Sequence, residues 1–297
     1  MSYEAKVLTD SVSPTGVRLT TMQVTFPRLM LSEFNTHRVF SRNSSSSRAV
    51  PTSKRLKQVL EDPFVPSTWG KNQKGMHAEE ELTGRDIDCA AEAWLSARDS
   101  AVKHAQDLLA LGIHKQTVNR LLEPFAWQTV IVTATEWSNF YALRLNRSAQ
   151  PEFQKIAEMM RDAQRSSDPV HVDFDDWHLP FVETSNAFDL FVGGMSIDDL
   201  RKVSAGRCAR VSYLTHDGHV DPTTDDKLQR SGHMSPLEHV ARPMTLEDAQ
   251  NIVANQMVTL PGILDVDAAN VFCGNLRGWV SLRKTILNED DFSKRES

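Results

Sequence analysis

The chain lacks a basic excess, long apolar runs and paired cysteines, and each absence excludes a class of protein. Lys and Arg number 33 against 39 Asp and Glu, a formal net charge of −6, which argues against a general coat for duplex DNA or RNA. No run of about 18 apolar residues is present, so no segment is expected to span a membrane. The N-terminus lacks the basic and apolar stretches of a secretory signal. Cys89, Cys208 and Cys273 form no CxxC pair, which favours a reduced, cytoplasmic setting.

The motifs of several common enzyme classes are also missing. There is no GxGxxG after a predicted strand, no GxxxxGK[ST], no HExxH and no GxSxG. None of the cysteines lies in an electropositive turn with a nearby histidine, so a cysteine nucleophile is not indicated. His233 and His239 have no third ligand at a recognisable spacing, so no metal site is expected.

The patterning predicts one α+β domain over residues 1–297, with 166–195 as the candidate connection. Alternating β-branched residues around a Ser-Pro-Thr-Gly turn predict a β-hairpin over 4–26. Ser196, followed by Asp198 and Asp199, indicates the start of a helix. Residues 125–144 are typical of a strand followed by a helix. Further helices are expected at 77–111, 115–122, 151–165, 224–232, 235–241 and 245–256, and connections at 41–51 and 52–75.

Residues 33–48 combine arginines with four consecutive serines. Small hydroxylated residues let main-chain N–H groups approach a phosphate, and arginines match its oxygens with paired donors. The composition therefore predicts a cradle for a nucleotide phosphate. The same composition is typical of a flexible surface loop, so both interpretations stay open.

Residues 232–239 (GHMSPLEH) also allow two interpretations. Ser235, Pro236 and Glu238 follow the pattern of an N-cap, a first-turn proline and a capping-box acid. That pattern does not explain His233 and His239, and a helix N-terminus flanked by histidines equally suits an anionic cofactor. Elsewhere, single arginines on predicted helices are usually solvated or ion-paired surface groups.

Three sets of segments resemble the flavin-dependent thymidylate synthase family. The first is residues 36–48 (THRVFSRNSSSSR), in which the His-Arg, the Ser, the Asn, the later Ser and the final Arg fall in register with the family signature. The second comprises 118–124 (VNRLLEP), 139–144 (NFYALR) and 149–152 (AQPE), and the third 209–213 (ARVSY) and 232–239. Because the third set comes first in the family, the resemblance implies a circularly permuted α+β domain of that type, with an extra helical C-terminal segment.

The resemblance implies FAD, methylenetetrahydrofolate and NADPH as cofactors, and a homotetramer with shared active sites. The implied reaction transfers a folate carbon to C5 of a deoxypyrimidine monophosphate, with dUMP to dTMP favoured and no nucleic-acid or membrane partner. Arg144 matches the arginine that polarises the pyrimidine ring. The implied nucleotide-side residues are Glu33, Thr36, Ser45, Ser46, Ser47, Arg48, Arg120 and Arg144. The implied flavin-side residues are His37, Arg38, Asn43, Asn139, Ser212, His233, Ser235 and Glu238, with Thr133 and Thr135 as further candidates.

The chain departs from the family signature at three positions. Thr36 stands where the family has its first Arg, Ser44 where it has Glu, and Glu33 where it has Gln. A carboxylate accepts a hydrogen bond from the exocyclic amine of cytosine but repels the O4 carbonyl of uracil. A dCMP substrate and a hydroxymethylated product therefore stay open beside dUMP methylation, as does a flavin- or nucleotide-binding protein without turnover. A nucleic-acid-binding module is disfavoured by the net charge.

Overall fold

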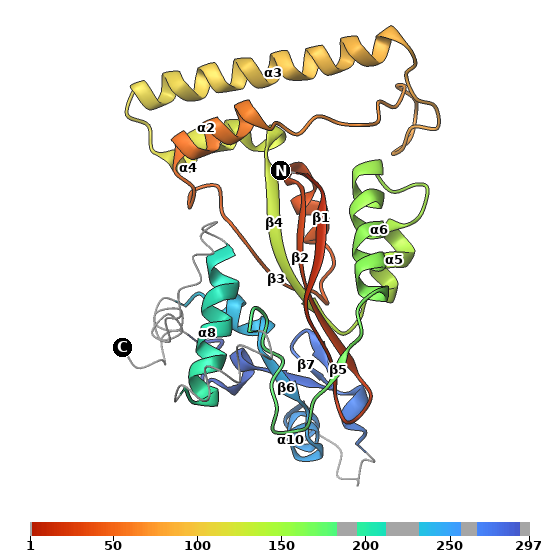
Figure 1. Cartoon of the computed structure of the whole chain (residues 1–297), viewed down its shortest axis with the longest axis vertical. Coiled ribbons are helices and arrows are strands. Elements are labelled where there is room, and N and C mark those ends of the chain that lie inside the picture. The colour runs from red at the N-terminus through yellow and green to blue at the C-terminus, as the bar shows by residue number, and fades with distance from the viewer. Residues whose placement is uncertain (1, 183–194, 212–231, 257–265, 292–297) are drawn as a thin grey trace.

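The computed structural model describes residues 2–182, 195–211, 232–256 and 266–291. Figure 1 shows three regions along the long axis: a helical layer at one end, a twisted sheet in the middle and a smaller mixed region at the other end. Apart from Gly232, the helix expected at 224–232 lies outside the described residues. Within the described part, no helix is long and apolar enough to cross a membrane.

The central sheet has five strands in the order β3-β4-β2-β1-β5. Neighbouring strands are antiparallel except β1 and β5, which are parallel. Residues 41–44, expected within a connection, form a strand because their main chain pairs with residues 130–133, a partner that no local pattern reveals. The strands are β1 (Glu4–Val12), β2 (Arg18–Pro27), β3 (Ser41–Ser44), β4 (Trp127–Ala134) and β5 (Val170–His171).

The predicted hairpin over 4–26 is confirmed by the pairing of β1 with β2, from Glu4 opposite Thr25 to Val12 opposite Arg18. Its turn is specified locally. The N–H of Gly16 donates to the carbonyl of Ser13 over 2.9 Å, and Gly16 adopts a φ of 80°. Glycine reaches that left-handed conformation without steric strain.

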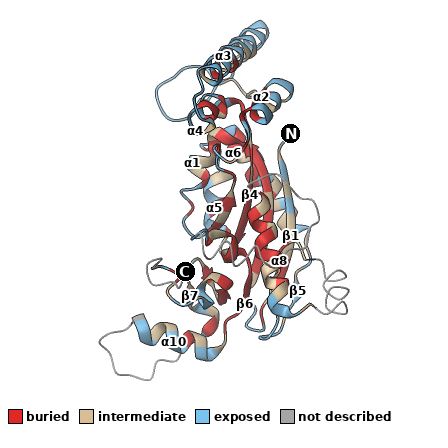
Figure 2. Cartoon of the chain, turned by 90° about the vertical axis from the view of Figure 1, so that its left-hand side faces the viewer, coloured by how far each residue is buried: buried red, intermediate tan, exposed pale blue. Residues whose placement is uncertain are grey.

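One face of the sheet carries the main core. Side chains at alternate positions of β2 and β4 point to this face. Helices α1 (Leu31–Phe34), α5 (Ser138–Arg144) and α6 (Pro151–Arg165) cover it, and Figure 2 shows the buried residues concentrated along these strands. The fully buried ring of Phe34 packs against the rings of Phe26, Phe40, Phe140 and Phe153. The short helical stretch before β3 is therefore anchored in the core.

The helical layer differs from the sequence-based expectation. It contains α2 (Thr52–Glu61), α3 (Arg85–Ala110), α4 (Lys115–Val118) and the 3-10 helix η2 (Asn119–Phe125). Residues 52–75, expected as a connection, thus include a helix, which buries Leu56 and Val59 against α3 and η2. The predicted helix at 115–122 continues as a 3-10 helix that contains Pro124, which cannot donate to an α-helical ladder.

The mixed region contains one long helix and many short elements. The predicted helix start at Ser196 is confirmed by a capping box with Asp199 at the beginning of α8 (Ile197–Arg210). The C-terminal segment, expected to be helical, is mixed: Trp279 is fully buried and its indole N–H donates to the Val17 carbonyl over 3.1 Å. The other elements are η4 (Ser235–His239), β6 (Ala241–Pro243), α10 (Leu246–Gln256), η5 (Ala268–Asn270), β7 (Phe272–Cys273), β8 (Leu276–Arg277), β9 (Trp279–Ser281) and η6 (Leu282–Thr285).

A chain of buried polar side chains joins the mixed region to the second face of the sheet. His178 contacts Ser11 through Nδ1 (2.8 Å) and Thr21 through Nε2 (2.7 Å). Thr21 continues to Thr133 (2.6 Å), whose hydroxyl contacts His239 Nδ1 (2.8 Å). Burial lowers the pKa of both imidazoles to about 3, so both rings are neutral at neutral pH.

Candidate active site

Arg144, the last residue of α5, is the centre of the first group of predicted residues. Its Nε donates to His37 Nε2 over 2.9 Å, and its terminal nitrogens lie 3.4 Å from Glu33 Oε2 and 3.4 Å from Thr36 Oγ1. The guanidinium also stacks on the ring of Phe153, 4.3 Å from the centroid. The Arg144 side chain is 18% exposed. Its neighbours therefore orient the guanidinium at the edge of the core and leave it accessible to solvent.

His37 can accept the hydrogen bond from Arg144 because its ring is neutral. Burial, reinforced by the charges of Arg144 and Arg42, lowers the pKa of His37 to about 4. The ring packs edge-on against Phe140, with centroids 4.9 Å apart. A neutral acceptor orients the guanidinium without neutralising its charge. Predicted on the flavin side, His37 here contacts the nucleotide-side residue Arg144.

Burial alternates along the serine-rich segment, through β3 and into the turn at residues 47–49. Ser45 and Ser47 are buried, and their hydroxyls are bonded to Gln128 and Glu123 respectively. Ser46 and Arg48 are exposed. Of these predicted phosphate ligands, Ser46 and Arg48 therefore face outward, while the hydroxyls of the other two hold the segment on the protein.

Arg120 lies beside this segment, at the start of η2, and completes the second group of predicted residues. Its guanidinium forms an ion pair with Glu123 (2.9 Å), which also pairs with the buried Arg28 (3.1 Å). Burial alone would raise the pKa of the Glu123 carboxyl, but the hydrogen bond from Ser47 and the charges of Arg28 and Arg120 lower it below its usual value. The carboxyl is therefore ionised at neutral pH.

The two groups lie on different parts of the chain. Figure 1 shows α5, which ends at Arg144, beside the strands, and α4, which leads into η2 with Arg120, in the helical layer at one end of the sheet. One chain therefore presents Arg144 and the predicted phosphate ligands as separate groups.

The chain has recognisable relatives at the family level. Residues 11–170 match the Thy1 family, described as thymidylate synthase complementing protein. The chain belongs to the Thy1 family. The matched span, more than half of the chain, runs from the end of β1 to the start of β5 and includes the serine-rich segment, Arg120 and Arg144. No curated protein matches the chain.

Solved structures similar to this Thy1 chain include two of a UMP/dUMP methylase, PolB, from Streptomyces cacaoi. The structure with 5-Br UMP is 17% identical, with a TM-score of 0.45, and the match covers 55% of this chain and 88% of that one. The structure with 5-Br dUMP is 16% identical, with a TM-score of 0.44, covering 55% and 90%. The resemblance to the thymidylate synthase family is thus confirmed, while the circular permutation stays a prediction because the third set of segments lies outside residues 11–170.

A polar cavity of about 640 Å³ gathers several predicted flavin-side residues of this Thy1 chain. It is lined by Arg38, Arg42, Asn43 and Ser235 among others. Asn43 Nδ2 donates to the carbonyl of Cys208 over 2.7 Å, and the Ser235 hydroxyl donates to Asn43 Oδ1 over 3.4 Å. Two guanidinium groups with an amide and hydroxyls are the donor set that a dinucleotide's phosphates require, so these residues fit FAD.

The other predicted cofactor residues lie elsewhere. Asn139 and His233 are exposed, and Ser212 lies outside the described residues. Glu238 pairs with Arg283 (2.5 Å) and lines a separate cavity of about 240 Å³. Thr135 accepts a hydrogen bond from the Arg277 N–H (3.1 Å).

The expected helix cap at Ser235 is not formed. Residues 235–239 make a short 3-10 helix, η4, whose N-cap position is Met234. The Ser235 hydroxyl bonds Asn43 on β3, and Glu238 reaches the C-terminal segment. Partners far away in the sequence therefore replace the local capping pattern, and His239, one of the two histidines expected beside the cap, is buried against Thr133.

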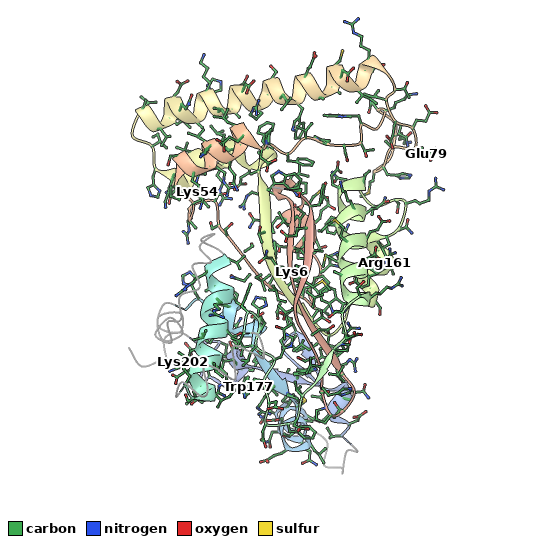
Figure 3. All side chains as sticks on the ribbon, in the orientation of Figure 1. Lys6, Lys54, Glu79, Arg161, Trp177 and Lys202 are labelled. Carbon is green, nitrogen blue, oxygen red and sulfur yellow. The ribbon has the colours of Figure 1, made fainter. Side chains whose placement is uncertain are left out.

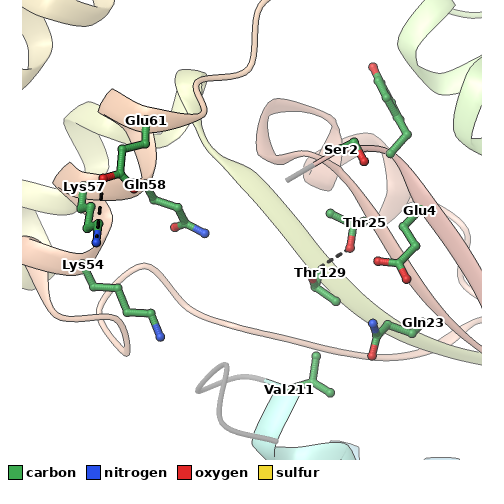
Figure 4. A pocket seen from close by; sticks show the side chains of 11 residues that line it. Ser2, Glu4, Gln23, Thr25, Lys54, Lys57, Gln58, Glu61, Thr129 and Val211 are labelled. Carbon is green, nitrogen blue, oxygen red and sulfur yellow. Dashed lines mark hydrogen bonds and ion pairs between the residues drawn. The ribbon is translucent and has the colours of Figure 1, made fainter.

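A larger cavity of about 920 Å³ contains none of the predicted residues. It lies between α2 and the exposed end of the sheet, and its lining includes Lys54 and Lys57 on one wall and Gln23, Thr25 and Thr129 on the other (Figure 4). Figure 3 shows where Lys54 lies on α2. Sequence patterns did not reveal this cavity because two lysines on one helix resemble an ordinary solvent face.

Proposed function

We propose that this protein catalyses flavin-dependent transfer of a one-carbon unit from methylenetetrahydrofolate to C5 of a deoxypyrimidine monophosphate, with dUMP to dTMP as the favoured reaction. The observation that carries this proposal is the convergence of Arg144 on His37, Glu33 and Thr36, which lie 107 to 111 residues earlier in the chain. Membership of the Thy1 family supports the same chemistry.

Arg144 is the proposed catalytic residue. When C5 of the pyrimidine becomes nucleophilic, negative charge develops on the ring, and a guanidinium oriented beforehand stabilises that charge without reorganisation. His37 fixes one edge of the guanidinium, and Phe153 limits its movement on one face. These contacts supply the orientation that such a role requires.

The remaining residues bind and position. Ser46, Arg48 and Arg120 are exposed donors that would hold the nucleotide's phosphate, while Arg38, Asn43 and Ser235 would hold FAD. Bound FAD in its reduced form supplies the hydride, with NADPH as its proposed reductant. We propose a homotetramer because the two groups of nucleotide-side residues lie on different parts of one chain, one beside the strands and one in the helical layer, so that a second copy would complete each site.

Product mass analysis tests the proposal. The purified protein would receive FAD, NADPH, methylenetetrahydrofolate and equal amounts of dUMP and dCMP, with the Arg144→Ala variant as the control. A nucleotide heavier by one methyl group on uracil is the expected product. A modified cytosine nucleotide or a hydroxymethyl product would show instead that the enzyme makes a modified pyrimidine nucleotide other than dTMP. Tight flavin binding with no folate-dependent product would favour a non-catalytic binding protein.

Glu33 provides a reason to keep dCMP as a second candidate substrate. Its carboxylate lies 3.4 Å from the Arg144 guanidinium, and its side chain is 45% exposed, so it is available to a ligand beside the catalytic arginine. If Glu33 contacts the base, Glu33→Gln should shift the ratio of kcat/KM for dUMP over dCMP by about tenfold toward dUMP, since an amide can donate to O4. Competition assays with both nucleotides measure this ratio. An unchanged ratio would show that Glu33 does not contact the base.

A further inference from the structure

Four buried or half-buried polar side chains hold the inner side of the serine-rich segment: Arg28, Gln128, Asn119 and Glu123. Arg28 Nη1 and Gln128 Nε2 both donate to the carbonyl of Ser45 (3.2 and 3.3 Å). Asn119 Nδ2 donates to the carbonyls of Ser47 (2.7 Å) and Val50 (2.9 Å). Arg28 directly follows β2, Gln128 lies near the start of β4, and Asn119 begins η2. The segment therefore has a defined conformation in spite of its loop-like composition.

Glu123 has a special place among these side chains because one carboxylate oxygen serves three partners. Oε1 accepts from the Ser47 hydroxyl, pairs with the buried Arg28 at 3.1 Å, and pairs with the exposed Arg120 at 2.9 Å. A buried ion pair contributes little net stability, because the loss of hydration offsets much of the attraction. The role of Glu123 is instead to hold the serine-rich segment, through Ser47, and Arg120 on the same oxygen atom.

A turn after β3 converts this inner anchor into an outer alignment. The Ala49 N–H donates to the Ser46 carbonyl over 2.9 Å, and with Ser45 and Ser47 buried on the inner side, this turn leaves Ser46 and Arg48 exposed. Arg120 is held beside them by Glu123. Three donors to a phosphate thus take their positions from a single carboxylate beneath them.

The charge balance beneath the segment also favours an anion. Arg55 is 2% exposed and donates to Gln58 Oε1 (3.1 Å), yet within the described residues no carboxylate forms an ion pair with it. Its Nε and that of Arg28 are buried without a hydrogen-bond partner. With Arg28, Arg55 and Arg120 around one carboxylate, the local charge is positive, and a phosphate dianion placed on the outer side would be attracted to it.

We propose that Glu123 is a positioning residue that aligns Ser46, Arg48 and Arg120 for the phosphate group of the nucleotide. This inference rests on the proposed function for the identity of the ligand. It predicts that loss of the Glu123 carboxylate weakens recognition of the phosphate specifically, while recognition of the pyrimidine beside Arg144 is retained.

Direct binding measurements test this inference separately from turnover. Isothermal titration would give the dissociation constants of dUMP and deoxyuridine for the FAD-loaded wild-type protein and for Glu123→Gln. The variant should bind dUMP at least tenfold more weakly and deoxyuridine within about twofold of wild type. Glu80→Gln, which removes an exposed carboxylate paired with Lys71, is the matched control and should bind both ligands as wild type does.

A second variant keeps the test informative if Glu123→Gln fails to fold, since that change leaves the buried Arg28 without a carboxylate. Ser47→Ala breaks the link between the segment and Glu123 without uncovering a charge, and should weaken dUMP binding about threefold with no effect on deoxyuridine. Equal losses for both ligands, or no loss for dUMP, would overturn the positioning role. Failure of the wild-type protein to bind dUMP would instead refute the proposed function.

Discussion

Replacing Arg144 with alanine is expected to lower turnover of the pyrimidine nucleotide by about 100- to 1,000-fold, the usual cost of removing a donor that stabilises transition-state charge. The guanidinium is held by His37, Glu33 and Thr36 and stacks on Phe153, and none of these partners can replace its positive charge. FAD content should be unchanged, because the cavity lined by Arg38, Asn43 and Ser235 does not include Arg144.

Steady-state assays with dUMP and flavin absorbance of the purified variant check both parts of this expectation. Arg147→Ala removes an exposed arginine three residues further on, and serves as the control that should retain full activity. Normal turnover in Arg144→Ala would show that Arg144 is not the catalytic residue.

Mixing two inactive variants tests whether the site is shared between copies. Arg48→Ala should also be inactive, since it removes an exposed donor proposed for the nucleotide's phosphate. If each site takes Arg144 from one subunit and Arg48 from another, co-expression of the two single variants should restore about a quarter of wild-type activity by random pairing. The double variant Arg48→Ala/Arg144→Ala, expressed alone, should remain inactive. No recovery in the mixture would place both arginines in a site built by one chain.

The free energy of unfolding is expected to fall steeply as pH drops below about 6.5. His178 and His239 are completely buried, and burial lowers the pKa of each to about 3, against about 6.5 in the unfolded chain. The unfolded state therefore binds more protons in this window. The stability from the neutral rings is fully present above pH 6.5 and is lost progressively as pH falls toward 3.

Each of these histidines contributes a slope of about 1.4 kcal/mol per pH unit, and His37, whose pKa burial lowers to about 4, contributes the same, so the three give roughly 4 kcal/mol per unit. Between pH 6.5 and 4.5 this loss is comparable to the whole stability of an ordinary domain. Urea denaturation at a series of pH values measures the slope. His178→Gln should lower it by about a third, while His104→Gln, at an exposed position, should leave it unchanged. A flat profile between pH 6.5 and 4.5 would contradict the neutral buried pair.

Elements specified by neighbours in the chain could be predicted from the sequence. The β1–β2 hairpin depends on its own alternation and on Gly16, the start of α8 on Ser196 with Asp199, and α6 on Pro151 at its first turn. The same holds for the family, since the motif residues within the matched span occur in the sequence itself. Each of these signals is complete within a few residues, so no distant partner is needed to interpret it.

The site depended on tertiary structure wherever a residue's partner is far away in the sequence. Residues 41–44 form a strand because β4 pairs with them, and Ser235 bonds Asn43 instead of capping a helix. The family resemblance assigned Arg144, the serine-rich segment and Arg120 to the nucleotide side, a prediction that did not distinguish the outward Ser46 from the inward Ser47. Glu123 lies in the family segment 118–124 but received no predicted role, because its importance lies in a contact with Ser47, 76 residues away, and in the burial of Arg28 behind it. Composition and spacing determine which chemistry is available, whereas only packing decides which groups are buried, neutral or aligned.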